Sequence, residues 1–275
     1  MHKAQKELRQ RCKDIHVAIE ILDSRILHSS SNPLIAQIFA DRPRVKLFNK
    51  TDLAEPKITQ AWQQVYEARG DTCLQIRADK LASEEKLISE LEKFAPLDGS
   101  PLRCLIVGIP NVGKSTLLNK LAGRKVARTA NEPAVTRSQQ VIRISDKIRL
   151  IDTPGLLWPK LESPFAAYRL AAVSAIKNTA YEYIDVALFV IGSIELLYPG
   201  SIAKHFKLAR AQNHREPEQI LELLGKHWAF RSSGGQVDFE RAARKLMLAF
   251  HGGELAGYSL ESTDMISAEA RYLVS

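Results

Sequence analysis

The chain has 275 residues, 45% of them hydrophobic, and a formal net charge of +8. That length and apolar content allow one or two domains with buried cores and exclude a chain too polar to fold. The positive charge favours a polyanionic partner, and three cysteines without paired spacing indicate a reducing compartment, the cytoplasm, rather than a disulfide-stabilised scaffold.

The first predicted elements are a basic helix and a strand. Lysine and arginine dominate residues 3–13, and the low apolar content of this segment excludes a signal peptide. Residues 17–22, Val-Ala-Ile-Glu-Ile-Leu, are typical of a short strand.

A guanine-reading motif, Asn49-Lys50-Thr51-Asp52, follows the next predicted strand, residues 44–48. An ionised Asp carboxylate only accepts hydrogen bonds, and guanine offers it two donors, N1–H and the 2-amino group. Asp52 is therefore predicted to select guanine. Asn49 would bond the base edge and brace the phosphate loop, and the Lys50 stem would cover the base face.

A phosphate-binding loop begins at Gly108, after a predicted strand at 72–76, a helix at 84–94 and an apolar strand at 102–107. Residues 108–115 satisfy G-x-x-x-x-G-K-[ST] in full, and a predicted helix over 116–121 follows them. Lys114 would neutralise the β- and γ-phosphates, and Ser115 would ligate Mg²⁺. The loop and the helix N-terminus are predicted to contact the nucleotide through Val112, Gly113, Lys114, Ser115 and Thr116.

A second phosphate-sensing motif, Asp152-Thr153-Pro154-Gly155, follows the predicted strand at 148–151. Asp152 would hold the Mg²⁺ coordination sphere, mostly through water, and the Gly155 N–H would meet the γ-phosphate. Placed after a phosphate loop and at the end of a strand, this run predicts a nucleotide switch rather than a surface turn.

The guanine motif precedes the phosphate loop, which is the reverse of the order in an ordinary GTPase. Strands alternate with helices along this region, which predicts an α/β fold with a mostly parallel, doubly wound sheet. Such a sheet keeps its spatial neighbours when the old termini are joined and a new break is made in a loop. We therefore predict a circularly permuted P-loop GTPase domain over residues 1–162.

Residues 163–275 carry no nucleotide motif and predict a linker and a small helical domain. Helices are expected over 165–178, 185–194, 217–224 and 237–250, and the tail after Leu260 is expected to be disordered. The last of these helices has an expected core stripe of Phe239, Ala242, Ala243, Leu246 and Phe250.

Basic residues outnumber acidic ones between Ser201 and Phe250. The excess suits binding to a phosphate backbone, but the same charges equally suit solvated helix faces. Trp228 and Phe230 lie beside Lys226 and Arg231 in this stretch, and they suit either stacking on bases or a place in the core.

The chain resembles the circularly permuted ribosome-biogenesis GTPases of the YlqF/RbgA type over nearly its whole length. Besides the motif order, the resemblance is carried by several further runs, namely Asp23-Ser24-Arg25, Pro133-Ala134-Val135-Thr136, Asp152 to Pro159, Arg169 to Ala172 and Ser232 to Gly235. Two runs depart from the family pattern. Ala134 stands where the family tends to have Gly, and Ile76-Arg77-Ala78 stands where a Ser-Ala-like pair usually braces the base.

The resemblance implies roles for further residues. Thr136 would meet Mg²⁺ and the γ-phosphate, and Arg77 and Ala78 would contact the base largely through the backbone. Leu156 stands where Ras-like enzymes place a Gln that orients water, so intrinsic hydrolysis is expected to be slow. Asn111 matches an Asn that ligates K⁺ in potassium-dependent GTPases, and such an ion would stabilise transition-state charge.

The function implied is a GTP-hydrolysing assembly factor for the large ribosomal subunit. It would dock on precursor rRNA with GTP bound and leave after hydrolysis to GDP. The expected cofactor is Mg²⁺, with K⁺ as an addition. A cytoplasmic monomer with no DNA partner and no membrane span is expected. Two alternatives stay open, a tRNA-directed GTPase and an RNA-binding module that holds nucleotide structurally.

Overall fold

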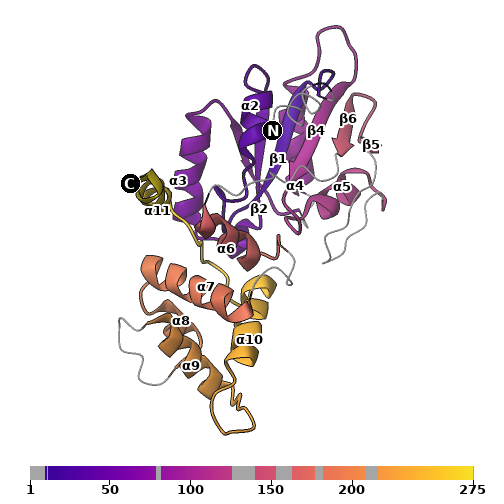
Figure 1. Cartoon of the computed structure of the whole chain (residues 1–275). Helices are drawn as coiled ribbons and strands as arrows, with labels where there is room; N and C mark the ends of the chain where they lie inside the picture. The colour runs from indigo at the N-terminus through magenta and orange to yellow at the C-terminus, as the bar shows by residue number, and fades with distance from the viewer. Residues whose placement is uncertain are drawn as a thin grey trace. The chain divides into compact units, whose positions relative to one another are not determined.

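The computed structural model describes residues 10, 12–78, 82–125, 140–152, 163–176, 182–208 and 216–274 (Figure 1). The chain forms two compact units. The first comprises residues 1–51 and 59–160, and the second comprises residues 52–58 and 161–275.

The first unit is built on a six-stranded sheet with the order β3-β2-β1-β4-β6-β5. All pairs are parallel except that of β5 and β6. The strands are β1 (Val17–Asp23), β2 (Arg44–Asn49), β3 (Thr72–Gln75), β4 (Leu102–Gly108), β5 (Gln140–Arg143) and β6 (Ile148–Asp152). The predicted α/β fold with a mostly parallel sheet is confirmed.

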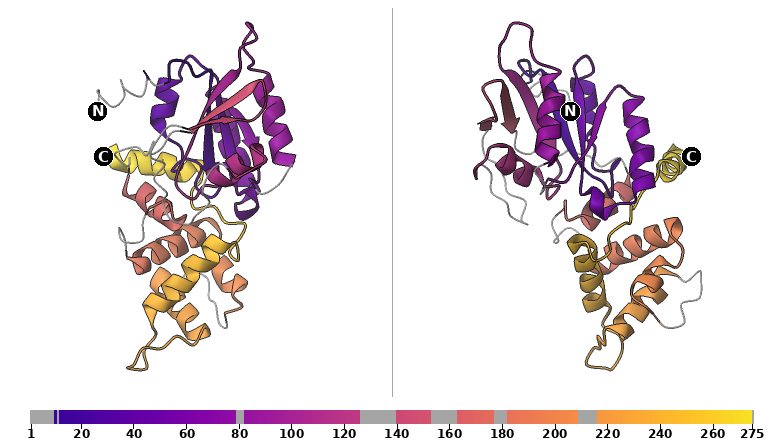
Figure 2. Two further views of the ribbon diagram at one scale, coloured as in Figure 1. Left: turned by 90° about the vertical axis from the view of Figure 1, so that its right-hand side faces the viewer. Right: turned by 180° about the vertical axis from the view of Figure 1, so that it is seen from behind.

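Helices cover both faces of this sheet (Figures 1 and 2). They are α2 (Pro33–Ile38), α3 (Pro56–Glu67), α4 (Ala82–Glu92) and α5 (Lys114–Leu121). All seven residues of β1 are buried, as a strand covered on both faces requires. Under α2, Ile35 and Phe39 join a buried cluster with Ala18, Leu105 and Ile151 from the central strands.

The carboxyl ends of the parallel strands meet at one edge of the sheet. Asp23 of β1 lies beside Asn49 of β2, and Ile21 of β1 lies beside Gly108 of β4. Asp152 ends β6 opposite Ile106 of β4, two residues before Gly108. In open α/β sheets ligands bind outside this edge, so the fold gathers the predicted nucleotide motifs at the expected place.

The second unit is helical. Its helices are α6 (Pro164–Ala172), α7 (Tyr183–Leu197), α8 (Ser201–His205), α9 (Pro217–His227), α10 (Phe239–Gly252) and α11 (Thr263–Val274). The apolar helix α7 packs against α6, α8, α9 and α10. Of the predicted α10 stripe, Ala242, Ala243, Leu246 and Phe250 are buried.

Three sequence predictions for this unit are wrong. The helix that begins at Pro164 ends at Ala172 rather than at residue 178, because Ser174 has a left-handed φ of 59° that ends a right-handed helix. Phe239 is 36% exposed, because it opens α10 directly after the N-cap Asp238. The tail is helical over α11 rather than disordered.

The second unit also includes residues 52–58. The Leu53 carbonyl accepts hydrogen bonds from the N–H groups of Gly257 at 3.0 Å and of Tyr258 at 3.2 Å. The Glu55 N–H donates to the Ser259 hydroxyl at 3.2 Å. The short segment after the guanine motif is thus hydrogen-bonded to the stretch between α10 and α11.

Among the described residues, no helix combines the length and the apolar character needed to cross a membrane.

Candidate nucleotide-binding site

Asn49 links two loops at the carboxyl edge of the sheet. It is the last residue of β2, and it is buried. Its side-chain Nδ2 donates to the Val112 carbonyl at 2.7 Å, and its Oδ1 accepts from the Ala78 N–H at 2.8 Å. One amide side chain therefore fixes the phosphate loop relative to the loop that follows β3.

Lys50 and Asn111 both have strained backbone conformations, and the two residues are hydrogen-bonded to each other. Both have left-handed φ values, 60° for Lys50 and 59° for Asn111, which are uncommon outside glycine. Such conformations cost on the order of 1–3 kcal/mol and persist where their surroundings enforce them. Lys50 Nζ donates to the Asn111 carbonyl at 2.8 Å, which joins the guanine motif to the phosphate loop a second time.

A buried carboxylate holds the Lys50 side chain. Asp23 ends β1 with no exposed surface, and its Oδ2 accepts from Lys50 Nζ at 2.9 Å and from Arg25 Nη2 at 2.8 Å. Burial alone would raise the pKa of Asp23, but the charges and hydrogen bonds of Arg25 and Lys50 outweigh it and hold that pKa well below its ordinary value. Asp23 therefore stays ionised and positions Lys50.

The phosphate loop has little room at two glycines. A Cβ on Gly108 would lie 2.9 Å from both the Ile21 carbonyl oxygen and Val112 Cγ1, closer than real Cβ contacts. Gly113 has a φ of 100°, which a side chain would strain. Gly113 is also the N-cap of α5, where no side chain caps the helix. The N–H groups and the positive end of the helix dipole at this N-terminus therefore favour binding of an anion.

Lys114, the first residue of α5, and Asp152, the last residue of β6, come together. Lys114 Nζ lies 2.5 Å from Asp152 Oδ1, and the Asp152 side chain is 4% exposed. Ser115 and Thr116 follow in the first turn of α5 and are half-buried. A cation for phosphates, a carboxylate and a hydroxyl therefore lie in one small region.

This donor set fits Mg²⁺, which takes oxygen ligands and keeps several waters and substrate phosphates in its coordination sphere. In the described ranges, no group of three or more His, Cys, Asp or Glu residues could hold a metal ion. The Ser115 hydroxyl and the Asp152 carboxylate thus suit a metal held mainly by its substrate rather than by a protein cage.

Of the remaining predicted site residues, the structure describes three and leaves two outside the described ranges. Asp52 lies in η1 (Thr51–Leu53), the 3-10 turn directly after β2, and is exposed. Arg77 is half-buried and Ala78 is buried in the loop after β3. Thr136 and Gly155 lie outside the described residues.

Sequence reasoning missed the Asp23 contact with Lys50. The run Asp23-Ser24-Arg25 was visible as a family motif, but its partner lies 27 residues further along the chain. The pairing of β1 with β2, which sets Asp23 beside Asn49, was the signal that could have found it.

Comparison with known proteins gives one consistent family. The model of the family described as "50S ribosome-binding GTPase" matches residues 103–226, and that of "RsgA GTPase" matches residues 33–162. The chain is 37% identical to "Ribosome biogenesis GTPase A" of Priestia megaterium over 261 residues, covering 90% of this chain and 89% of that protein. It is 34% identical to the protein of the same name from Bacillus cereus, over 96% of this chain and 92% of that protein.

Solved structures share the fold. The GDP-bound YlqF structure matches with a TM-score of 0.67 and 21% identity, covering 94% of this chain and 99% of that one. The structure of GNP-bound YlqF from T. maritima matches with a TM-score of 0.65 and 22% identity, covering 94% and 98%. The guanine motif at the end of β2, the phosphate loop after β4 and the identity to these relatives lead to one conclusion: the chain is a circularly permuted GTPase and belongs to the ribosome biogenesis GTPase A family.

Proposed function

We propose that this GTPase docks on the rRNA of the large ribosomal subunit precursor when GTP is bound and leaves after hydrolysis. Nucleotide binding is supported above all by Asn49, whose side chain is hydrogen-bonded to both the phosphate loop and the loop after β3. The names of the relatives support the ribosomal part.

Guanine would be read at the end of β2. The Asp52 carboxylate would accept from the N1–H and 2-amino groups of the base, which adenine does not present at those positions. The Lys50 stem, held in place by Asp23 and the Asn111 carbonyl, would cover the base face. Asn49 would bond the base edge, and the backbone around Arg77 and Ala78 would contact the base on its far side.

The triphosphate would lie over the N-terminus of α5. The N–H groups from Val112 to Thr116 would point at its oxygens, and Lys114 would exchange its contact with Asp152 for the β- and γ-phosphates. Mg²⁺ would neutralise charge that develops on the phosphates during transfer. Ser115, Thr136 and Asp152 would hold that ion, and Gly155 would meet the γ-phosphate.

Hydrolysis without a partner should be slow, because Leu156 cannot orient an attacking water by a hydrogen bond. We propose that the maturing large subunit supplies the missing catalytic element. A potassium ion ligated by Asn111 would stabilise transition-state charge between the phosphates.

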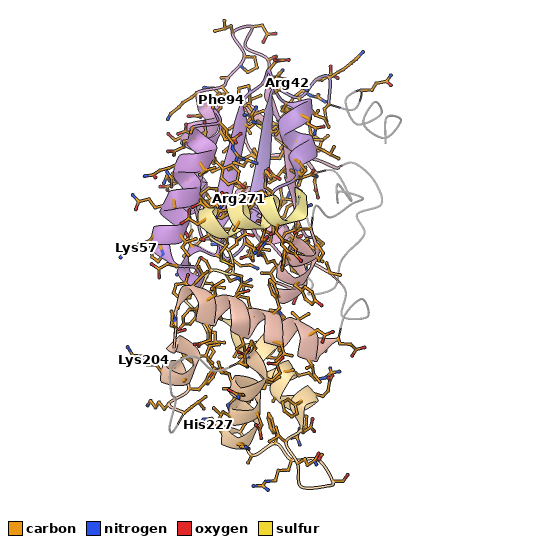
Figure 3. All side chains as sticks on the ribbon, turned by 60° about the vertical axis from the view of Figure 1, so that its left-hand side comes forward. Arg42, Lys57, Phe94, Lys204, His227 and Arg271 are labelled. Carbon is orange, nitrogen blue, oxygen red and sulfur yellow. The ribbon has the colours of Figure 1, made fainter. Side chains whose placement is uncertain are left out.

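The helical unit would carry the RNA contacts. Between Ser201 and Phe250 lysines and arginines outnumber aspartates and glutamates, and Lys204 in this stretch projects outward from α8 (Figure 3). Contacts of this kind release counterions from RNA, so binding should weaken steeply as salt rises.

The test is GTP turnover in potassium buffer with and without purified large ribosomal subunits. The proposal expects strong stimulation by the large subunit and little by the small subunit, which serves as the control. Turnover that stays equally slow with both would contradict it and would favour an RNA-binding module that holds nucleotide structurally.

The potassium site has a separate test. Exchanging K⁺ for Na⁺ should slow subunit-stimulated turnover of the wild type, while Asn111→Ala should be slow in both salts. If potassium stimulated turnover of the wild type and of Asn111→Ala equally, Asn111 would not be a ligand of the potassium ion.

A further inference from the structure

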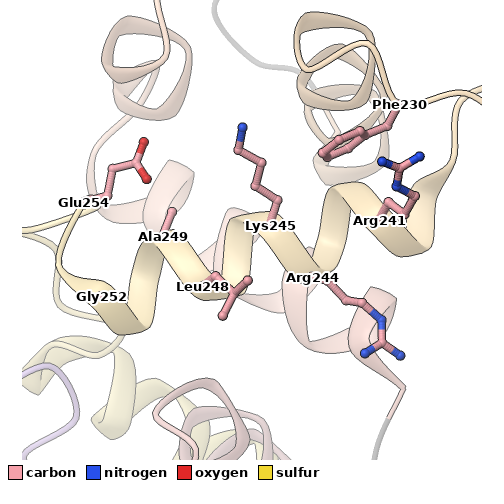
Figure 4. A pocket seen from close by; sticks show the side chains of 8 residues that line it. All are labelled: Phe230, Arg241, Arg244, Lys245, Leu248, Ala249, Gly252 and Glu254. Carbon is pink, nitrogen blue, oxygen red and sulfur yellow. The ribbon is translucent and has the colours of Figure 1, made fainter.

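The helical unit contains a pocket of about 620 Å³ beside α10. Six of its lining residues lie on α10 itself, Phe230 follows α9 and Glu254 follows α10. Figure 4 shows Glu254 at one end, Phe230 with Arg241 at the other, and Lys245 between them. The lining residues are Phe230, Arg241, Arg244, Lys245, Leu248, Ala249, Gly252 and Glu254.

Two cations of this pocket are held by aromatic rings rather than by carboxylates. The Arg241 guanidinium lies 4.5 Å from the centre of the Phe230 ring, and Lys245 Nζ lies 4.7 Å from that of Trp228. Among the ion pairs of the described residues, neither Arg241 nor Lys245 has a carboxylate partner. An aromatic ring fixes a cation without neutralising its charge, so both remain able to bind an anion.

Neighbouring cations are arranged differently. Arg244 pairs with Glu240 at 2.8 Å, and Lys226 pairs with Glu222 at 2.6 Å, both one helical turn apart. These are the ordinary pairs of a solvated helix face. Arg244 also lines the pocket, so the pocket cations that lack a carboxylate among the described ion pairs are Arg241 and Lys245.

The pocket lining also includes apolar side chains. Leu248 is 69% exposed although it lies beside the buried Ala249, and Phe230 is half-buried. An exposed apolar side chain next to unneutralised cations suits a ligand with a flat apolar body and an anionic group. The Glu254 carboxylate would repel the anion, which sets the anion at the Arg241 end and the flat body toward Glu254.

We propose that this pocket binds one unpaired nucleotide of single-stranded RNA. The base packs on Leu248 and Ala249, with its donor groups toward the Glu254 carboxylate. The phosphate on the same nucleotide contacts Arg241 and Lys245. The inference rests on the proposed function, because it names the kind of RNA site that the helical unit would recognise.

The test measures binding of the full chain to a short fluorescent single-stranded RNA and to an abasic strand of the same length. A base that covers the exposed Leu248 side chain buries apolar surface that an abasic strand leaves in water, so the wild type should prefer the RNA by about tenfold. Leu248→Ser should abolish this preference, whereas Lys245→Gln should weaken binding of both strands.

Matched controls are available on the same unit. Leu196 on α7 is also 69% exposed but lies outside the pocket, so Leu196→Ser should keep the preference. Lys226→Gln is the control for charge, because Lys226 does not line the pocket. Thermal unfolding should be unchanged in the leucine variants, since both side chains are exposed.

Three results would overturn the inference. The first is an equal affinity of the wild type for the RNA and for the abasic strand. The second is an equal loss of the preference for RNA in Leu196→Ser and Leu248→Ser. The third is displacement of the fluorescent RNA by an acidic peptide as strong as its displacement by unlabelled RNA. Stimulation of turnover by the large subunit together with no preference for bases would refute the pocket and leave the proposed function standing. If the wild type showed neither stimulation of turnover by the large subunit nor binding of RNA, both the pocket inference and the proposed function would be refuted.

Discussion

At the scale of single residues, we expect guanine selection to depend on one carboxylate, that of Asp52. Xanthine carries a carbonyl oxygen where guanine carries its 2-amino group, so an amide at this position matches xanthine and not guanine. Asp52→Asn should therefore lower affinity for GTP by about tenfold or more and raise affinity for xanthosine triphosphate. Titration of both nucleotides against wild type and variant measures the exchange. A variant that loses both nucleotides equally would place Asp52 outside base recognition.

Asp23 gives a prediction that depends on pH. Its folded pKa lies below its unfolded value of about 3.9, so its contribution to stability is complete above that pH and is lost as pH falls through the folded pKa. Asp23→Asn leaves the buried guanidinium of Arg25 and the half-buried ammonium of Lys50 beside a neutral amide. It should destabilise the protein by about 3 kcal/mol at pH 7, and by less below about pH 4.

Urea unfolding at neutral and acid pH measures this difference. Asp41→Asn is the control, because Asp41 is exposed and its substitution should cost little at either pH. The variant should also bind GTP more weakly than wild type, because Lys50 loses its anchor. A stability loss that does not change with pH would argue against an ionised Asp23.

At the scale of elements, a buried ion pair joins β1 to β2. Glu20 Oε2 and Lys46 Nζ lie 2.5 Å apart with side chains 2% and 3% exposed, and the Ser31 hydroxyl accepts from Lys46 at 2.9 Å. Removing one partner of such a pair leaves a buried charge uncompensated. Glu20→Leu should destabilise by about 3–5 kcal/mol. Adding Lys46→Met should recover only part of that loss, because the Glu20 carboxylate also accepts from the Asn32 N–H.

The exposed pair of Glu222 and Lys226 on α9 is the matched control for this cycle. Its side chains are about half exposed, and Glu222→Ala should cost less than about 1 kcal/mol. Chemical denaturation of the single and double variants gives the coupling energies. Equal coupling in the two pairs would mean that burial does not set the strength of the inner one.

The strands and the phosphate loop were predictable because their signals are local. The apolar run at 102–107 and the motif that follows it together specify β4, the turn and α5. The buried pair of Glu20 and Lys46 was not predictable in this way. Glu20 interrupts an apolar strand, and the partner that explains it stands 26 residues away. Its environment is decided by the sheet register, which no short window contains.

The helical unit was harder to predict at its helix ends. The left-handed φ of Ser174 and the exposure of Phe239 at the start of α10 depend on how the chain turns, and apolar periodicity does not encode that. The residues of α11, Thr-Asp-Met-Ile-Ser-Ala-Glu-Ala-Arg-Tyr-Leu-Val, include enough apolar side chains for an amphipathic helix, so the expectation of a disordered tail overlooked a signal that the sequence contains. Arg169 shows what was missed, because its buried guanidinium contacts Glu269 of α11.

At the scale of the whole molecule, the permutation decides which loop leads into the helical unit. The chain leaves the sheet at Asp152, passes through the predicted γ-phosphate loop and begins α6 at Pro164. In GTPases that loop changes its conformation with the nucleotide. We therefore expect the bound nucleotide to control the helical unit through covalent connection, without a further protein.

Co-sedimentation with large-subunit precursors tests this account most directly. The full chain is mixed with the particles in a non-hydrolysable GTP analogue, in GDP or without nucleotide, and the bound fraction is measured at fixed potassium and magnesium. The account predicts strong binding with the analogue and release with GDP. Equal binding in all three conditions would contradict it, because the nucleotide would then have no control over docking.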